Sequence, residues 1–62
     1  MLFKIDVEDS RGNFSMQQVE AVTLPEARQI ARNLHIREMK YDGKLIPYPT
    51  IWTFIEEETK HA

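Results

Sequence analysis

Apolar and polar residues alternate strictly near the start of the chain, over residues 2–8. The apolar set is Phe3, Ile5 and Val7, and charged residues occupy the positions between them. A period of two predicts a β-strand with one buried face. The run 9–13 then predicts a tight reversal, because its glycine and asparagine tolerate the positive φ that hairpin loops need.

A second strand is predicted over residues 14–22, but its apolar positions change phase. Phe14 and Met16 share one phase, whereas Val19 and Ala21 share the other. We interpret the change as a β-bulge, because one inserted residue reverses the facing of the side chains that follow it.

The run Thr-Leu-Pro-Glu at 23–26 predicts the start of a helix. The Thr23 hydroxyl can accept from the Glu26 amide while the Glu26 carboxylate reaches back to the Thr23 amide, and a proline is tolerated in the first turn. His35 follows the helix and is predicted to be a capping or surface residue. Apolar residues recur at helical spacing over about eleven residues and predict the buried face: Leu24, Ala27, Ile30, Ala31 and Leu34.

The remaining segment is predicted to add two or three strands. Residues 36–41 have the composition of a third strand, and Tyr-Asp-Gly-Lys at 41–44 predicts a type I′ hairpin. The strand that returns would lie at an edge, because Pro47 and Pro49 donate no hydrogen bonds to a ladder. Residues 50–55 are rich in β-formers and are predicted to be the last strand, with a short helix as the alternative.

This order of elements predicts an α+β fold: a small antiparallel sheet of four to five strands with one helix packed on one face (β-β-α-β-β). The 62 residues are enough for a single domain spanning 1–62, and the polar residues 56–62 are expected to fray. One helix covers one face of such a sheet, so the other face must meet water or a partner.

Composition excludes several classes of protein. The 42% hydrophobic content indicates a folded core, and the absence of cysteine excludes disulfides and thiolate metal sites. No apolar run is long enough for a signal peptide or a membrane span, so an intracellular, cytoplasmic protein that does not bind membranes is expected. A domain of this size buries only about 60% of its unfolded surface, which leaves little room for a catalytic cleft.

Catalysis is not expected either. Ser10 and Ser15 have no recognisable base beside them, and the spacing of His35 and His61 does not suggest a metal site. The two glycines both fall in turns, so there is no glycine-rich phosphate loop. We predict a protein that is not an enzyme and binds no metal and no cofactor.

Charge is distributed unevenly along the chain. The net charge is −2, yet the stretch 28–44 carries five basic residues, Arg28, Arg32, Arg37, Lys40 and Lys44. Such a stretch can contact phosphates, so a small nucleic-acid-binding or transcription-regulatory module is the alternative function. The negative total and the lack of paired RNA-stacking aromatics argue against direct nucleic-acid binding.

An acidic and aromatic surface is the favoured interaction site. The first strand carries its carboxylates opposite its apolar face, and the last strand is apolar on both faces. An apolar centre with a charged rim is typical of a protein–protein interface. The predicted partner-binding residues are Asp6, Glu8, Asp9, Trp52 and Phe54. The alternative is that the chain's own loops cover the aromatic residues.

The segment VEAVTLPEARQIAR at 19–32 resembles a segment common in small phage proteins, in which a strand ends in Glu-Ala before a Thr-Leu cap and a short helix. Several type I anti-CRISPR proteins are similar, with two strands, a helix and then antiparallel strands, and a phage inhibitor of bacterial RNA polymerase has a related pattern. The resemblance implies a small monomeric inhibitor in the host cytoplasm. Its implied partner is a host protein or ribonucleoprotein complex, with a type I effector subunit as the leading candidate.

Overall fold

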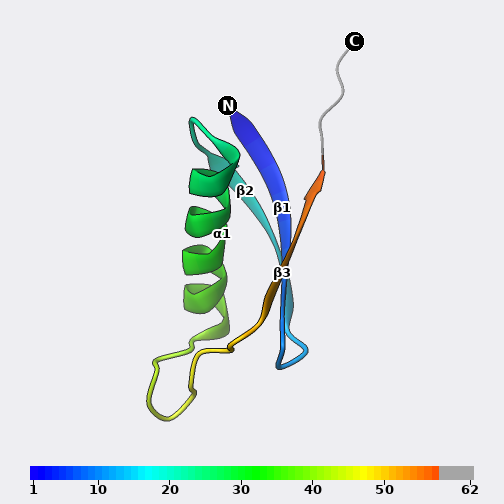
Figure 1. Ribbon diagram of the computed structural model, residues 1–62. Helices are drawn as coiled ribbons and strands as arrows, with labels where there is room; N and C mark the ends of the chain where they lie inside the picture. The colour runs from blue at the N-terminus through cyan, green and yellow to red at the C-terminus, as the bar shows by residue number, and fades with distance from the viewer. Residues whose placement is uncertain (58–62) are drawn as a thin grey trace.

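The computed structural model describes residues 1–57, which form three strands and one helix. In chain order these are β1 (Leu2–Asp9), β2 (Phe14–Glu20), α1 (Leu24–Met39) and β3 (Trp52–Glu57). The sheet is antiparallel with the order β2-β1-β3, and α1 lies against one of its faces (Figure 1). The α+β class with one helix is confirmed, but the sheet has three strands in place of the predicted four to five.

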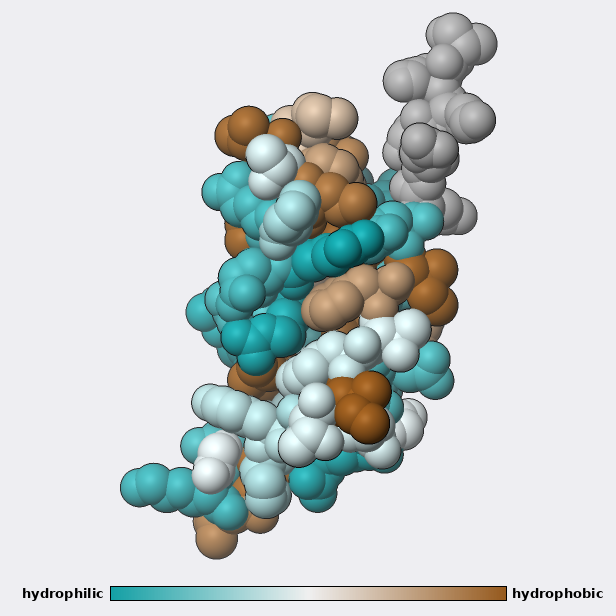
Figure 2. Space-filling view, in the orientation of Figure 1, coloured by the Kyte–Doolittle hydropathy of each residue, from teal (hydrophilic) through white to brown (hydrophobic). Residues whose placement is uncertain are grey.

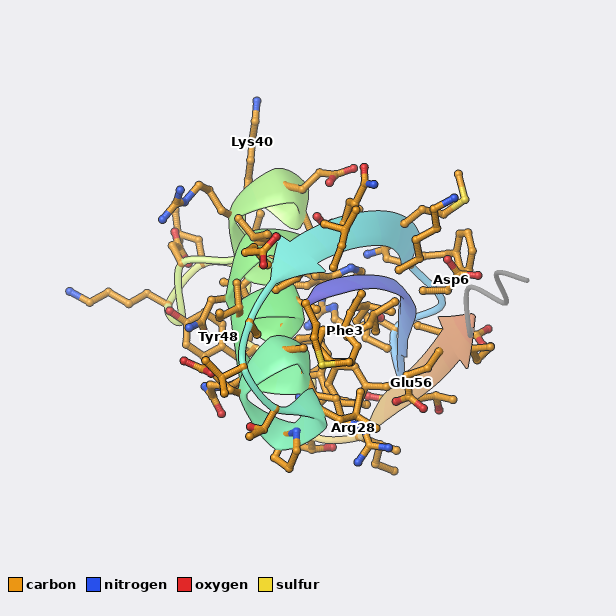
Figure 3. The ribbon with its side chains drawn as sticks, turned by 90° about the horizontal axis from the view of Figure 1, so that it is seen from above. Phe3, Asp6, Arg28, Lys40, Tyr48 and Glu56 are labelled. Atoms are coloured by element: carbon orange, nitrogen blue, oxygen red, sulfur yellow. The ribbon has the colours of Figure 1, made fainter. Side chains whose placement is uncertain are left out.

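The alternation along β1 places its two sets of side chains as predicted. Ile5 and Val7 are fully buried under α1, and Phe3 packs against the same core. Figure 3 shows Phe3 on the side of the sheet that faces the helix and Asp6 on the side that faces away. We call the side away from the helix the open face, because no described element covers it.

Strand β2 contains no bulge, so that prediction is wrong. Its pairing with β1 runs without interruption from Leu2 opposite Glu20 to Glu8 opposite Phe14. The apolar phase changes because Ser15 and Gln17 take inward positions in line with Val19, which sends Phe14 to the open face. These inward polar residues form hydrogen bonds with the helix, Ser15 with His35 and Gln17 with Glu38.

Helix α1 begins as predicted, with one difference in its cap. Thr23 Oγ1 accepts from the Glu26 amide at 3.4 Å, but Glu26 Oε1 accepts from the Val22 amide, 3.1 Å away. Ala27 and Ala31 are fully buried, which lets the helix lie close to the sheet. The predicted larger residues, Leu24, Ile30 and Leu34, pack partly buried against the same core.

The predicted third strand is wrong, because α1 continues through this segment for 16 residues in all. The helix ends at Lys40, which adopts the left-handed conformation with φ 60°. The Lys40 amide donates to the Arg37 carbonyl and the Tyr41 amide donates to the Ile36 carbonyl, each at 3.1 Å. This is the hydrogen-bond pattern of a Schellman motif, formed here without the usual glycine that would mark a helix end in the sequence.

The predicted hairpin is a loop that Asp42 organises. Asp42 Oδ1 accepts from the amides of Lys44 (2.8 Å) and Ile46 (3.0 Å), and these bonds lower the pKa of its carboxyl. The Ile46 carbonyl accepts in turn from the amides of Asp42 and Gly43. The last element is a strand and not a helix, as predicted, but it extends through Glu57 and so takes in part of the expected tail. Residues 58–62 lie outside the described residues.

Replacing Lys40 by glycine should stabilise the protein by about 1 kcal/mol, because glycine adopts positive φ without the steric cost that a side chain incurs. Urea unfolding monitored by circular dichroism measures the gain. Lys40→Ala is the control, since it removes the same charge but keeps a Cβ, and it should give no comparable gain. Equal effects of the two substitutions would contradict this account of the helix end.

Candidate functional site

The carboxylate of Asp9, at the end of β1, accepts four hydrogen bonds. Its Oδ2 accepts from the Tyr41 hydroxyl at 2.6 Å and from His35 Nε2 at 2.8 Å. Its Oδ1 accepts from the amides of Arg11 (2.8 Å) and Asn13 (3.2 Å). Asp9 is only 5% exposed, so these four donors replace the water that a carboxylate normally binds.

The second nitrogen of His35 continues the network. Ser15 Oγ lies 2.6 Å from His35 Nδ1 and accepts from Gln17 Nε2 at 2.8 Å. Gln17 Nε2 also donates to Glu38 Oε1 at 2.9 Å. Among the described residues, Nδ1 is the one acceptor near the Ser15 hydroxyl hydrogen, so the hydroxyl donates to it. In this arrangement His35 accepts at Nδ1 and donates from Nε2 to Asp9.

The prediction that His35 is a capping or surface residue is wrong, because its side chain is fully buried. It follows Ala27 and Ala31 at intervals of four residues on the face of α1 that meets the sheet. This spacing predicts that His35 points inward if the helix continues past Leu34. Ser15 also has an imidazole beside it, contrary to the prediction that neither serine has a base nearby.

Serine, histidine and aspartate are the residue types of a nucleophilic hydrolase, but their burial argues against that role here. Ser15 is 4% exposed and His35 is 0% exposed, so the hydroxyl does not reach a substrate in solution. The Trp52 ring lies edge-on to His35 with the ring centroids 5.5 Å apart. Among residues 1–57, every buried side-chain nitrogen and oxygen has a partner, as expected for a structural network.

The network sets the ionisation of its members. Burial alone raises the pKa of the Asp9 carboxyl, but hydrogen bonds from Tyr41, His35 and the amides of Asn13 and Arg11 outweigh it and lower the pKa to about 2. Burial and the bond to Asp9 raise the pKa of Tyr41. Asp9 is therefore a stable anion at neutral pH.

The open face carries a different set of residues. Across the strands, Asp6 lies between Met16 and Ile55, and Glu8 lies beside Phe14. Met16 is 74% exposed, and Phe14 and Ile55 are each 50% exposed. Beside them is a shallow depression of about 300 Å³. It is lined by Lys4, Asp6, Met16, Gln17 and Gln18.

The five predicted partner-binding residues do not form one surface. Asp6 and Glu8 lie on the open face, but Trp52 and Phe54 pair with Asp9 and Val7, so they project toward the helix side. There the two aromatic residues pack partly buried against the core, and the Asp9 carboxylate is buried.

Sequence reasoning missed the apolar members of the open face, Phe14, Met16 and Ile55, as part of a binding surface. Phe14 and Met16 occur in strict alternation after the turn, so a strand without a bulge would have placed them there.

Within residues 1–57, no group of three or more metal-ligating side chains is suitably placed to hold a metal ion. None of the described helices is long and apolar enough to cross a membrane. No protein-family model matches the chain, and no curated protein or solved structure is significantly similar to it.

The stability of the protein should fall as the pH decreases from about 4 to about 2. The pKa of Asp9 is lowered from 3.8 to about 2 in the folded protein. Its contribution to the free energy of unfolding is therefore complete above pH 3.8 and is lost as the pH falls through about 2. The loss attributable to Asp9 should be on the order of 2 kcal/mol. Urea unfolding measured across this pH range tests the expectation.

Asp9→Asn should cost about 2–3 kcal/mol at neutral pH and should flatten this acid dependence. Asp6→Asn is the matched control, because it changes a carboxylate on the same strand outside the network, and it should keep the acid dependence of the parent. An acid dependence that Asp9→Asn leaves unchanged would show that the network does not control stability.

Proposed function

We propose that this chain is a binding protein that acts by covering a surface of another protein with the open face of its sheet. The observation that carries the proposal is the uncovered face itself. It combines three apolar side chains that are at least half exposed with the carboxylates of Asp6 and Glu8. The apolar side chains are Phe14, Met16 and Ile55. An exposed apolar patch that is rimmed by charge on so small a domain is typical of an interaction site.

The two kinds of residue would contribute differently to binding. Desolvation of the apolar side chains supplies affinity, while the carboxylates steer the encounter and select the partner. The partner therefore needs an apolar surface with basic side chains beside it. Surfaces that bind nucleic acid are basic, so a protein that holds DNA or RNA has this chemistry.

The resemblance of residues 19–32 to small phage proteins supports a narrower form of the proposal. In this form the chain is a phage-encoded inhibitor, and its partner is a subunit of a type I CRISPR effector. The open face would then occupy a basic surface that the effector uses for nucleic acid. The net charge of −2 suits a local contact better than mimicry of a whole DNA segment.

In a bacterial strain with an active type I CRISPR system, expression of this chain should restore plaque formation by a targeted phage. The double variant Asp6→Lys with Glu8→Lys should lose most of this effect, because it repels a basic surface. Gln29→Lys on the exposed side of α1 is the control and should behave as the parent. Circular dichroism verifies that each variant folds.

Two outcomes separate the broad proposal from the narrow one. Failure to restore plaques would refute the CRISPR target alone. If a protein retained by the immobilised parent is retained equally by the Asp6 and Glu8 double variant, the open face is not the binding surface.

The alternative, a nucleic-acid-binding module, requires that the basic residues of 28–44 be free to contact phosphates. Two of these residues already make contacts within the chain. Arg28 Nε lies 2.6 Å from Glu56 Oε2, and the Arg32 guanidinium lies 5.8 Å from the centroid of the Trp52 ring. We therefore expect no mobility shift of duplex or single-stranded nucleic acid at physiological salt. A shift that weakens steeply as salt is raised would favour the alternative.

A further inference from the structure

Strand β3 has one edge without a partner. It pairs with β1 on one side, and no described strand lies on the other side (Figure 1). The helix packs mainly over β1 and β2, so Trp52 and Phe54 of β3 remain partly exposed. Figure 2 shows tan and brown apolar surface along the course of β3, beside the teal side chains of α1.

A free edge of this kind is a template for a further strand. It presents a row of unpaired amide and carbonyl groups, and proteins usually block such edges with lysine, proline or a bulge. The sequence of β3, Trp-Thr-Phe-Ile-Glu-Glu, contains no lysine or proline, its two charged residues lie at its end, and its pairing with β1 is regular. Its first four residues are also strong β-formers.

The opposite edge of the sheet, formed by β2, is less suited to this pairing. On its helix side, Gln17 donates to Glu38 of α1, so the helix extends close to this edge. The strand is also richer in polar residues, with Ser15, Gln17 and Gln18 in its centre. The helix therefore limits the space for an added strand at the β2 edge more than at the β3 edge.

We propose that two copies of this chain associate through their β3 edges, antiparallel and about a twofold axis, so that the two sheets become one. The occupant of the edge is thus a second copy, which offers the same unblocked strand. An isologous contact of this type closes on itself and leaves no further β3 edge free.

Charge complementarity specifies the register. With Phe54 of each copy on the axis, Trp52 lies opposite Glu56 of the second copy. Arg32, which lies over Trp52 and has no ion pair among the described residues, then approaches that glutamate. Glu56 already pairs with Arg28 of its own chain at 2.6 Å. Each Glu56 would thus lie between two arginines, one from each copy.

This dimer would leave both open faces uncovered and on the same side of the continued sheet. A ligand with two matching sites would then bind both faces with increased avidity. The dimer and the proposed function share one strand, because Ile55 of the open face belongs to β3. Asp6 and Glu8 belong to β1 and take no part in the β3 contact, so their charge reversal tests the proposed function without altering the dimer contact.

Sedimentation velocity over a wide range of protein concentrations tests the proposal, and the parent should sediment as a dimer at the upper end. Thr53→Lys should weaken the dimer at least about tenfold, because it places a lysine on the contact edge. Gln18→Lys introduces the same side chain on the opposite edge strand and should leave association unchanged. Circular dichroism checks that both variants fold.

A charge-exchange pair tests the register. Arg32→Glu and Glu56→Arg should each weaken the dimer, because each brings like charges together at both contacts. An equimolar mixture of the two variants should restore it, since every contact then joins a glutamate to an arginine. The proposal is overturned if the parent stays monomeric, if Gln18→Lys weakens association while Thr53→Lys does not, or if the mixture remains monomeric.

Discussion

The buried carboxylate of Asp9 is the point at which the separate segments of this chain are joined. It accepts hydrogen bonds from the β1–β2 turn, from His35 of α1 and from Tyr41 after the helix. Burying a charge is costly unless donors surround it, and here four donors do so. The apolar core is small, with Ile5 and Val7 as its largest fully buried apolar residues. The hydrogen bonds to Asp9 are directional, so they fix the relative positions of these segments. So few apolar contacts would not do this alone.

This network also explains which parts of the fold could be predicted from the sequence. The first strand and the helix start carry strong local signals, alternation and a cap, and both predictions were confirmed. The errors involve residues of the network or its neighbours. Ser15 and Gln17 point inward, so their positions suggested a bulge, and His35 was assigned to the surface. Periodicity treats a polar residue as an outward one, and this assumption fails where the polar groups satisfy one another inside.

The candidate site was predicted in part for a related reason. Alternation along β1 was sufficient to place Asp6 and Glu8 opposite the core. It was not sufficient for β3, because both sides of that strand are apolar and the sequence does not say which side the helix covers. The register resolves this point: Phe54 is opposite Val7 and therefore shares the helix side. Asp6 and Glu8 are thus separated from Trp52 and Phe54 by the thickness of the sheet.

The central strand β1 contributes side chains both to the core and to the open face. Its register with the neighbouring strands decides which side chains lie on which face. Its odd-numbered residues Ile5, Val7 and Asp9 are buried, while Lys4 and Glu8 are exposed on the open face. A slip of one residue would exchange the two faces. A slip of two residues keeps the facing, and apolar residues alone discriminate weakly against it, because one apolar side chain packs much like another. Asp9 discriminates strongly, because a shifted strand would leave His35 and Tyr41 buried without their acceptor. The same carboxylate that closes the core therefore also keeps Asp6 and Glu8 on the surface where a partner can reach them.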